Sequence, residues 1–329
     1  MKKLLFIVAI LISACTHQQK YADNSLFTKV FYQPKYTDSF KIYSNPQDST
    51  SRMLVVHKPD TLQITIPDDG FKSLICLSST YVGYIDMAGE SKRITGVSRI
   101  NYVTNTTVRN NAKEIGFEGT FDYETIMSLN PDIALIYGIN GPNPIVAKLQ
   151  ELNIPYIYIQ DYEEQHPLGR AEWLIALGAL VGKDMRNEFT QIVNNYRPTN
   201  GTRKVMLNAP FSGTWFIPGE KSYMSRLIND AGGIINVEQP KGETSKALDV
   251  EIAIPALNSA DIWLNPGQVS SVSDAKNLAP HTIFNGPIWN QTPNFYELGA
   301  SRPDLVVEEL QHILNGDDHF EYQYFYKLQ

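Results

Sequence analysis

Short apolar runs alternate with segments of helical spacing through most of the chain. In the first half, the apolar run SLIC leads into a polar turn and a helix that ends near Gly89, and RITGVS follows as a second strand. Two helix–strand pairs come next, the second with a helix over Ile145–Leu152 and a strand over Tyr156–Ile159. Strands that alternate with helices in this way predict a parallel sheet with right-handed crossovers.

The same alternation returns after residue 201, from the strand KVMLNA to a final helix within RPDLVVEELQHIL. Between the two series lies a helical stretch that is broken at Gly182, with Phe189, Ile192 and Tyr196 at helical spacing in its second half. We therefore predict an α/β fold of two αβ lobes with mainly parallel sheets, joined by a single long helix.

One phrase is repeated in the two halves. Residues Asp122–Gly138 read DYETIMSLNPDIALIYG, and residues Asp249–Gly267 read DVEIAIPALNSADIWLNPG. In each copy a glutamate (Glu124 or Glu251) lies near a helix start, an aspartate begins a strand and a glycine follows that aspartate six residues later. The match in corresponding positions indicates duplicated lobes, although the second copy has two more residues between its glutamate and its aspartate.

The chain starts with MKKLLFIVAILISAC, in which two lysines precede the apolar run Leu4–Ile12. This run is too short to span a bilayer as a stable helix, and the pattern is typical of a secretory signal. Beyond it, SFKIYS and RMLVVHKPD predict a hairpin around the loop NPQDSTS, and TLQITIP is a candidate further strand. We divide the chain into a signal peptide (1–14), a tether with an N-terminal β-hairpin (15–69), an N-terminal α/β lobe (70–165), connecting helices (166–200), a C-terminal α/β lobe (201–316) and an aromatic tail (317–329).

Composition narrows the functions that the chain can have. Its formal charge of −7 becomes −9 once Lys2 and Lys3 leave with the signal, and an acidic exported chain disfavours nucleic acid as a partner. None of the six histidines has another histidine or a cysteine at metal-ligand spacing, which disfavours a site for a bare metal ion. The sequence also lacks a Walker-type phosphate loop and a G-x-S-x-G elbow.

Ligands of open α/β sheets bind beyond the carboxyl ends of the strands, so the residues there are candidates for a binding site. They are rich in aromatic rings and amides and short of acids, which suits a large, flat, partly apolar ligand with polar edges. A general base would need a carboxylate or histidine in this set, so we expect no enzyme. The candidate ligand-binding residues are Thr80, Tyr81, Ser98, Arg99, Asn101, Tyr102, Tyr137, Gly138, Trp215, Asn265, Gly267, Phe295 and Tyr296.

Three arginines could pair with anionic groups of a ligand: Arg99, Arg170 and Arg302. Each could instead form a surface salt bridge, which contributes little energy. Trp215 likewise has two interpretations, because it follows a C-lobe strand but could pack in the core. Two other tryptophans are predicted to belong to the core: Trp173 and Trp263.

The segment ISAC at residues 12–15 resembles a bacterial lipobox. The resemblance implies that Cys15 is lipidated and tethers the mature chain to a membrane, in which case only Cys76 is left and no intramolecular disulfide can form. The residues that follow, THQQKYAD, have no acidic cluster and no aspartate directly after the cysteine. We expect a lipoprotein that faces the periplasm or the outer face of a single-membrane cell, on a membrane that the sequence does not specify. An ordinary signal peptide with an incidental cysteine is the alternative.

A family resemblance covers most of residues 70–316. The N-terminal half contains IGFEGTFDYETIMSLNPDIALIYG and then KLQELNIPYIYI, and the C-terminal half contains LINDAGG and ASRPDLVVEELQHIL. These phrases resemble those of the ABC-transporter binding proteins for vitamin B12, haem and ferric siderophores. The resemblance implies two lobes bridged by one rigid helix, a shallow cleft and little closure. The N-terminal hairpin departs from the compact members of this family.

The resemblance also implies a function. A monomer would capture a metal chelate (cobalamin, haem or a ferric siderophore) between its lobes, without a cofactor of its own, and deliver it to a permease dimer with its ATPase. Glu124 and Glu251 would dock on arginines of that dimer. Tyr81, Tyr102 and His166 stay open as axial ligands of a haem. The alternatives are an exported chelate reductase or hydrolase on the same scaffold, and a sensor or scaffold lipoprotein.

Overall fold

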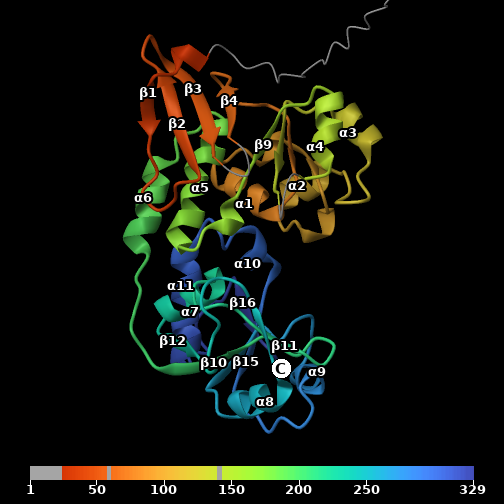
Figure 1. The fold of residues 1–329 in the computed structure, drawn as a ribbon, viewed down its shortest axis with the longest axis vertical. Helices are drawn as coiled ribbons and strands as arrows, with labels where there is room; N and C mark the ends of the chain where they lie inside the picture. Colours follow the sequence, from red (N-terminus) through yellow and green to blue (C-terminus); the bar gives the residue numbers. More distant parts are fainter. Residues whose placement is uncertain (1–23, 58–60, 139–142) are drawn as a thin grey trace, which may run out of the picture.

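The computed structural model describes residues 24–57, 61–138 and 143–329. The N-terminal sheet and the N-lobe lie side by side at one end of the long axis, the C-lobe lies at the other end, and two connecting helices join the lobes (Figure 1). The predicted signal peptide and Cys15 lie outside the described residues.

The N-lobe is built on a five-stranded parallel sheet in the order β7-β6-β5-β8-β9. Most of its strand residues are buried, because helices cover a parallel sheet on both faces. The strands are β5 (Leu74–Cys76), β6 (Ile94–Val97), β7 (Lys113–Glu114), β8 (Ile133–Ile136) and β9 (Tyr156–Tyr158). The helices are α1 (Ser79–Met87), α2 (Thr106–Asn111), α3 (Tyr123–Leu129) and α4 (Ile145–Glu151).

The C-lobe repeats this plan with a sheet in the order β12-β10-β14-β15-β16. Its first four strands are parallel, whereas β16 comes from the aromatic tail and adds an antiparallel edge strand. The strands are β10 (Arg203–Leu207), β12 (Gly233–Ile235), β14 (Ile262–Leu264), β15 (Ile288–Gln291) and β16 (Phe325–Lys327), with a separate antiparallel pair β11 (Trp215–Ile217) and β13 (Lys246–Leu248). The helices are α7 (Tyr223–Asp230), α8 (Val250–Asn258), α9 (Val272–Leu278), α10 (Pro293–Glu297) and α11 (Pro303–Asn315). The predicted pair of αβ lobes is confirmed.

The connection between the lobes consists of two helices, α5 (Pro167–Leu180) and α6 (Arg186–Asn195), instead of one uninterrupted helix. Gly182 has a φ of +74°, the left-handed conformation that commonly ends a helix and that other residues adopt at a cost. The glycine break in the sequence therefore divides the expected helix, and α6 leads through residues 196–202 to β10.

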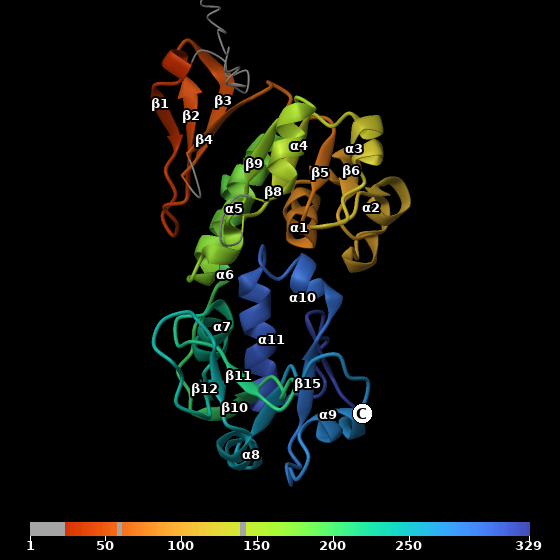
Figure 2. The same ribbon diagram turned by 45° about the vertical axis from the view of Figure 1, so that its right-hand side comes forward.

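The N-terminal region is a four-stranded antiparallel sheet in the order β1-β2-β3-β4, larger than the predicted hairpin. Its strands are β1 (Lys29–Tyr32), β2 (Phe40–Asn45), β3 (Asp48–Val56) and β4 (Leu62–Ile66). The turn between β2 and β3 is shorter than predicted, because Asn45 already pairs with Asp48. One face of the sheet joins the main core and packs on α5, beside β9 (Figure 2). Phe27, Met53 and Val55 form a small second cluster on the other face.

Two glutamates attach this sheet to the N-lobe. The side chain of Glu172 in α5 is fully buried and accepts hydrogen bonds from the Tyr32 hydroxyl at 2.5 Å and from the backbone N–H groups of Lys35 and Tyr36 at 2.7 Å each. Glu164 accepts from the hydroxyl of Thr37 at 2.5 Å. The segment between β1 and β2 is thus held by carboxylates from outside the N-terminal sheet.

Replacement of Glu172 tests how strongly this attachment stabilises the protein. Glu172→Ala leaves three partly buried donors without their acceptor, so we expect the free energy of unfolding to fall by roughly 3 kcal/mol. The control Glu321→Ala removes an exposed carboxylate from the tail and should change it by less than about 0.5 kcal/mol. Urea unfolding followed by circular dichroism measures both, and equal effects would contradict the attachment.

Candidate functional site

The two lobes meet where helices follow the carboxyl ends of their strands. Helix α1, which follows β5, packs on α10, which follows β15 (Figure 2). The Thr80 hydroxyl donates to the carbonyl oxygen of Tyr296 at 3.1 Å, so two candidate residues from different lobes are in direct contact. A Cβ atom on Gly83 would lie 1.9 Å from the carbonyl oxygen of Glu297, and only glycine permits this approach.

On the N-lobe side, Arg99 lies among aromatic rings. Its guanidinium carbon is 3.5 Å from the ring centroid of Phe117, and its Nη1 donates to the Tyr102 hydroxyl at 3.2 Å. Tyr102 and Phe117 are exposed, at 56% and 39%, so this group can be reached by a ligand. Arg99 forms no ion pair with the residues that the structure describes. Burial raises the pKa of Tyr137, with the Glu118 charge adding to the shift and the Arg99 charge opposing it, which indicates that Tyr137 lies near Arg99.

The remaining N-lobe candidates lie in the segments that follow the strands. The Ser98 hydroxyl donates to the carbonyl oxygen of Leu77 at 2.9 Å, and Asn101 is exposed. The carbonyl oxygen of Gly138 accepts from the hydroxyl of Tyr162 at 2.7 Å.

On the C-lobe side, Tyr296 is 54% exposed and its hydroxyl donates to Gln291 Oε1 at 2.8 Å. Its neighbour Phe295 packs on Phe325 of the tail, with ring centroids 5.5 Å apart. The carbonyl oxygen of Gly267 accepts from Asn290 Nδ2 at 2.6 Å.

Two asparagines and a tail tyrosine belong to this face. Asn265 was predicted from the sequence, whereas Asn208 and Tyr326 were missed. Asn208 and Asn265 each follow a strand in the left-handed conformation, with φ of 63° and 56°, and Asn265 Nδ2 donates to Asn208 Oδ1 at 3.5 Å. The signal was present, because both strands end in Leu-Asn. The Tyr326 hydroxyl accepts from Asn290 Nδ2 at 3.2 Å, because the aromatic tail returns to the C-lobe sheet as β16.

Two candidate ligand residues are corrected by the structure. Tyr81 is 1% exposed and its hydroxyl donates to the carbonyl oxygen of Ile159 at 2.9 Å, so it ties α1 to the end of β9. Trp215 is fully buried, and its indole N–H donates to the carbonyl oxygen of Leu207 at 2.7 Å. Neither ring presents a surface to a ligand, whereas the neighbouring Phe216 is 44% exposed. Two other tryptophans are fully buried, as predicted: Trp173 and Trp263.

The other two arginines have partners within the protein. Arg170 Nε donates to the carbonyl oxygen of Asp161 at 2.9 Å, and its guanidinium carbon lies 4.1 Å from the ring centroid of Tyr223 in the C-lobe. Arg302 forms a two-pronged pair with Asp304, at 2.9 and 2.8 Å. His166 caps α5, because its Nδ1 accepts from the N–H of Leu168 at 3.0 Å. That contact gives His166 a structural role at the start of α5.

Glu124 and Glu251 occupy equivalent positions on the two lobes. Each is exposed in the first turn of its helix, α3 or α8, after an aspartate that caps that helix. Neither forms an ion pair with any residue in the described part of the chain.

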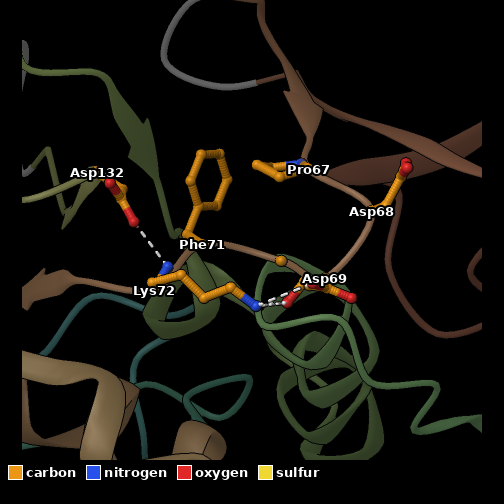
Figure 3. Close-up of a pocket in the computed structure, with 7 residues that line it drawn as sticks. Pro67, Asp68, Asp69, Phe71, Lys72 and Asp132 are labelled. Carbon is orange, nitrogen blue, oxygen red and sulfur yellow. Dashed lines mark hydrogen bonds and ion pairs between the residues drawn. The ribbon is translucent and has the colours of Figure 1, made fainter.

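A pocket of about 400 Å³ lies at the opposite end of the N-lobe sheet, between that lobe and the N-terminal sheet (Figure 3). Its acids have protein partners: Asp132 accepts from the N–H of Lys72 at 2.7 Å, and the Lys72 ammonium group lies 3.6 Å from Asp69 Oδ2. The pocket precedes β5, whereas the candidate residues follow the strands.

Residues 24–57, 61–138 and 143–329 contain neither a metal-ligand cluster nor a candidate membrane span. No group of three or more His, Cys, Asp and Glu side chains there could hold a metal ion. No helix in these ranges is both long enough and apolar enough to cross a bilayer.

Comparison with known proteins gives a family match and several structural likenesses. The family model described as "Periplasmic binding protein" matches residues 74–300. An uncharacterized lipoprotein of Methanocaldococcus jannaschii, MJ0878, is 24% identical over 218 residues, which are 62% of this chain and 53% of the relative. The chain therefore matches about half the length of that curated relative.

Two solved structures have the same fold. One is a periplasmic heme binding protein from Pseudomonas aeruginosa, with a TM-score of 0.60 and 15% identity over 79% of this chain and 98% of that one. The other is the petrobactin-binding protein YclQ from Bacillus subtilis, with a TM-score of 0.56 and 15% identity over 82% of this chain and 99% of that one.

Asp161 is a buried acid close to the contact between the lobes. Burial raises its pKa from 3.8 to about 6, although the Arg170 charge and the Tyr84 hydroxyl act in the opposite direction. The folded protein therefore holds a proton on Asp161, between about pH 4 and pH 6, that the unfolded chain releases.

This difference predicts a pH dependence of stability. The contribution of Asp161 is fully present below about pH 4 and is lost as the pH rises through about 6, so the free energy of unfolding should fall across that window. Burial also raises the pKa of Glu172, Glu297 and Glu309, so these acids contribute to the pH profile of the wild type too. The contribution of Asp161 is therefore measured as the difference between the wild-type profile and that of the variant. Asp161→Asn should flatten the profile between pH 4 and pH 7. Asp122→Asn should leave it unchanged there, because hydrogen bonds to Thr125 lower the pKa of Asp122. An unchanged profile for Asp161→Asn would contradict this assignment.

Proposed function

Because the chain belongs to the periplasmic binding protein family, we propose that it captures a metal chelate between its lobes and delivers it to an ABC permease dimer with its ATPase. The candidate cargoes are cobalamin, haem and ferric siderophores. The observation that carries this proposal is the position of Arg99, which lies among exposed rings at the strand ends and forms no ion pair with any described residue. Structural neighbours described as heme-binding and petrobactin-binding support the same class of ligand.

The chemistry of this face suits a flat, anionic chelate. The exposed rings of Tyr102 and Tyr296 offer apolar surface on the two lobes, and planar ligands pack well on such rings. Arg99 already lies against Phe117, so its guanidinium is held in place and loses little freedom when it binds a carboxylate or a phenolate. The face therefore combines stacking with one fixed positive charge.

The proposal includes a lipid anchor at Cys15. Two curated relatives carry the name lipoprotein, which supports it. Eight residues separate Cys15 from Asn24, where the described structure begins, and they span at most about 30 Å. The N-terminal sheet would then lie near the membrane surface, on a protein that faces the periplasm or the outside of a single-membrane cell.

Glu124 and Glu251 would provide the contact with the permease. A two-fold-symmetric permease offers the same basic groups twice, and the two lobes offer one exposed glutamate each. Such pairs add modest affinity but set the register of docking and the rate of encounter.

The ligand class is tested by a screen with haemin, cobalamin and several ferric siderophores, followed by thermal shift and tryptophan fluorescence. We expect at least one chelate to bind, and Arg99→Gln to weaken an anionic chelate about tenfold, because a charge-assisted hydrogen bond is lost. Arg109→Gln removes an exposed positive charge from the same lobe and should leave affinity unchanged. Stabilisation by a bare divalent ion alone, with no effect of any chelate, would contradict the proposal.

Docking is tested by reversal of the two charges. In cells that carry the matching permease and ATPase, Glu124→Lys with Glu251→Lys should abolish uptake and spare ligand binding. Glu188→Lys with Glu220→Lys reverses two other exposed glutamates and should preserve uptake. Normal uptake by the first double variant would refute the docking role.

A further inference from the structure

Glu297 is an acid of the C-lobe whose carboxylate is bound by the N-lobe. It is the last residue of α10 and is 1% exposed. Its Oε1 accepts from the backbone N–H of Asn105 at 3.0 Å, and its Oε2 accepts from the backbone N–H of Thr104. Both donors precede α2, so a single side chain links the two lobes through main-chain atoms.

The backbone of α10 meets the N-lobe at two further points. Gly83 of α1 approaches the carbonyl oxygen of Glu297, and Thr80 of the same helix donates to the carbonyl oxygen of Tyr296. Carbonyl groups and carboxylate of one short helix are therefore held by two separate elements of the other lobe. Such contacts leave α10 little freedom to move with the rest of the C-lobe.

We propose that Glu297 is a positioning residue that fixes the separation of the lobes and presents α10 to the ligand. This inference rests on the proposed function, because α10 also carries Phe295 and Tyr296. The helix has five residues, so the direction of the exposed Tyr296 ring depends on where the helix ends are held. With Glu297 bound, the backbone of Tyr296 stays in contact with the Thr80 hydroxyl, and the site is formed before the ligand arrives. The entropy cost of ordering the site on binding is then smaller.

Glu309 provides a matched control. It too is a buried acid on a C-lobe helix, and it accepts from the backbone N–H groups of Gln323, Tyr324 and Phe325. All of these partners belong to the C-lobe and the tail. Glu309→Gln therefore perturbs the same kind of contact without touching the contact between the lobes.

The test compares Glu297→Gln with Glu309→Gln in the full chain. A glutamine places an N–H₂ group against one of the two N–H donors, so at least one hydrogen bond is lost. We expect amide hydrogen exchange at Thr104 and Asn105 to accelerate about tenfold or more, with a larger radius of gyration in small-angle scattering. Haemin, used as the probe, should bind about tenfold more weakly. In Glu309→Gln, faster exchange should be confined to residues 323–325, with unchanged radius and affinity.

A second variant disturbs the contact between the lobes without altering the Glu297 carboxylate. Gly83→Ala places a methyl group against the carbonyl oxygen of Glu297 and should also enlarge the radius of gyration. If both Glu297→Gln and Gly83→Ala keep the wild-type radius, the proposal is wrong and Glu297 is a local cap of α2. The exchange and scattering measurements need no ligand. Failure of the wild type to bind haemin would therefore count against that cargo, and the scattering result would still decide the role of Glu297.

Discussion

Buried carboxylates that accept hydrogen bonds from the backbone of another part hold this molecule together. Glu172 binds the segment between β1 and β2 to α5, Glu297 binds the C-lobe to the N-lobe, and Glu309 binds the aromatic tail to α11. A carboxylate removed from water is costly unless such donors satisfy it, and a backbone donor left without its acceptor is costly as well. Each junction therefore forms with its full set of partners or is substantially weakened.

These junctions explain where a binding site can lie. The N-terminal sheet is attached to α5 on the side of β9, away from the C-lobe, so it leaves the strand ends uncovered (Figure 2). The tail closes the outer edge of the C-lobe sheet through β16 and brings Tyr326 toward Asn290. Attachment on both sides leaves the loops after the strands uncovered, and there Arg99 lies among exposed rings without an ion pair in the described structure.

Much of this arrangement could be predicted from the sequence, because alternating strands and helices specify two parallel lobes and the repeated phrase marks their equivalence. The family was predicted correctly and is confirmed by the match over residues 74–300. The direction of individual side chains was harder to predict, because a position after a strand does not determine which way its side chain points. Trp215 begins β11, whose residues alternate between buried and exposed, so the tryptophan points inward and Phe216 outward. The N-terminal sheet was underestimated because its first strand, β1, has only four residues and none of them is buried.

The central claim is that a chelate binds between the strand ends of both lobes. It is tested most directly by a crystal structure of the protein with the chelate that binds most tightly. We expect the ligand to contact Arg99 in the N-lobe and Tyr296 in the C-lobe in one bound position. A ligand held by one lobe alone, or in the pocket beside the N-terminal sheet that is lined by Pro67 and Lys72, would contradict it.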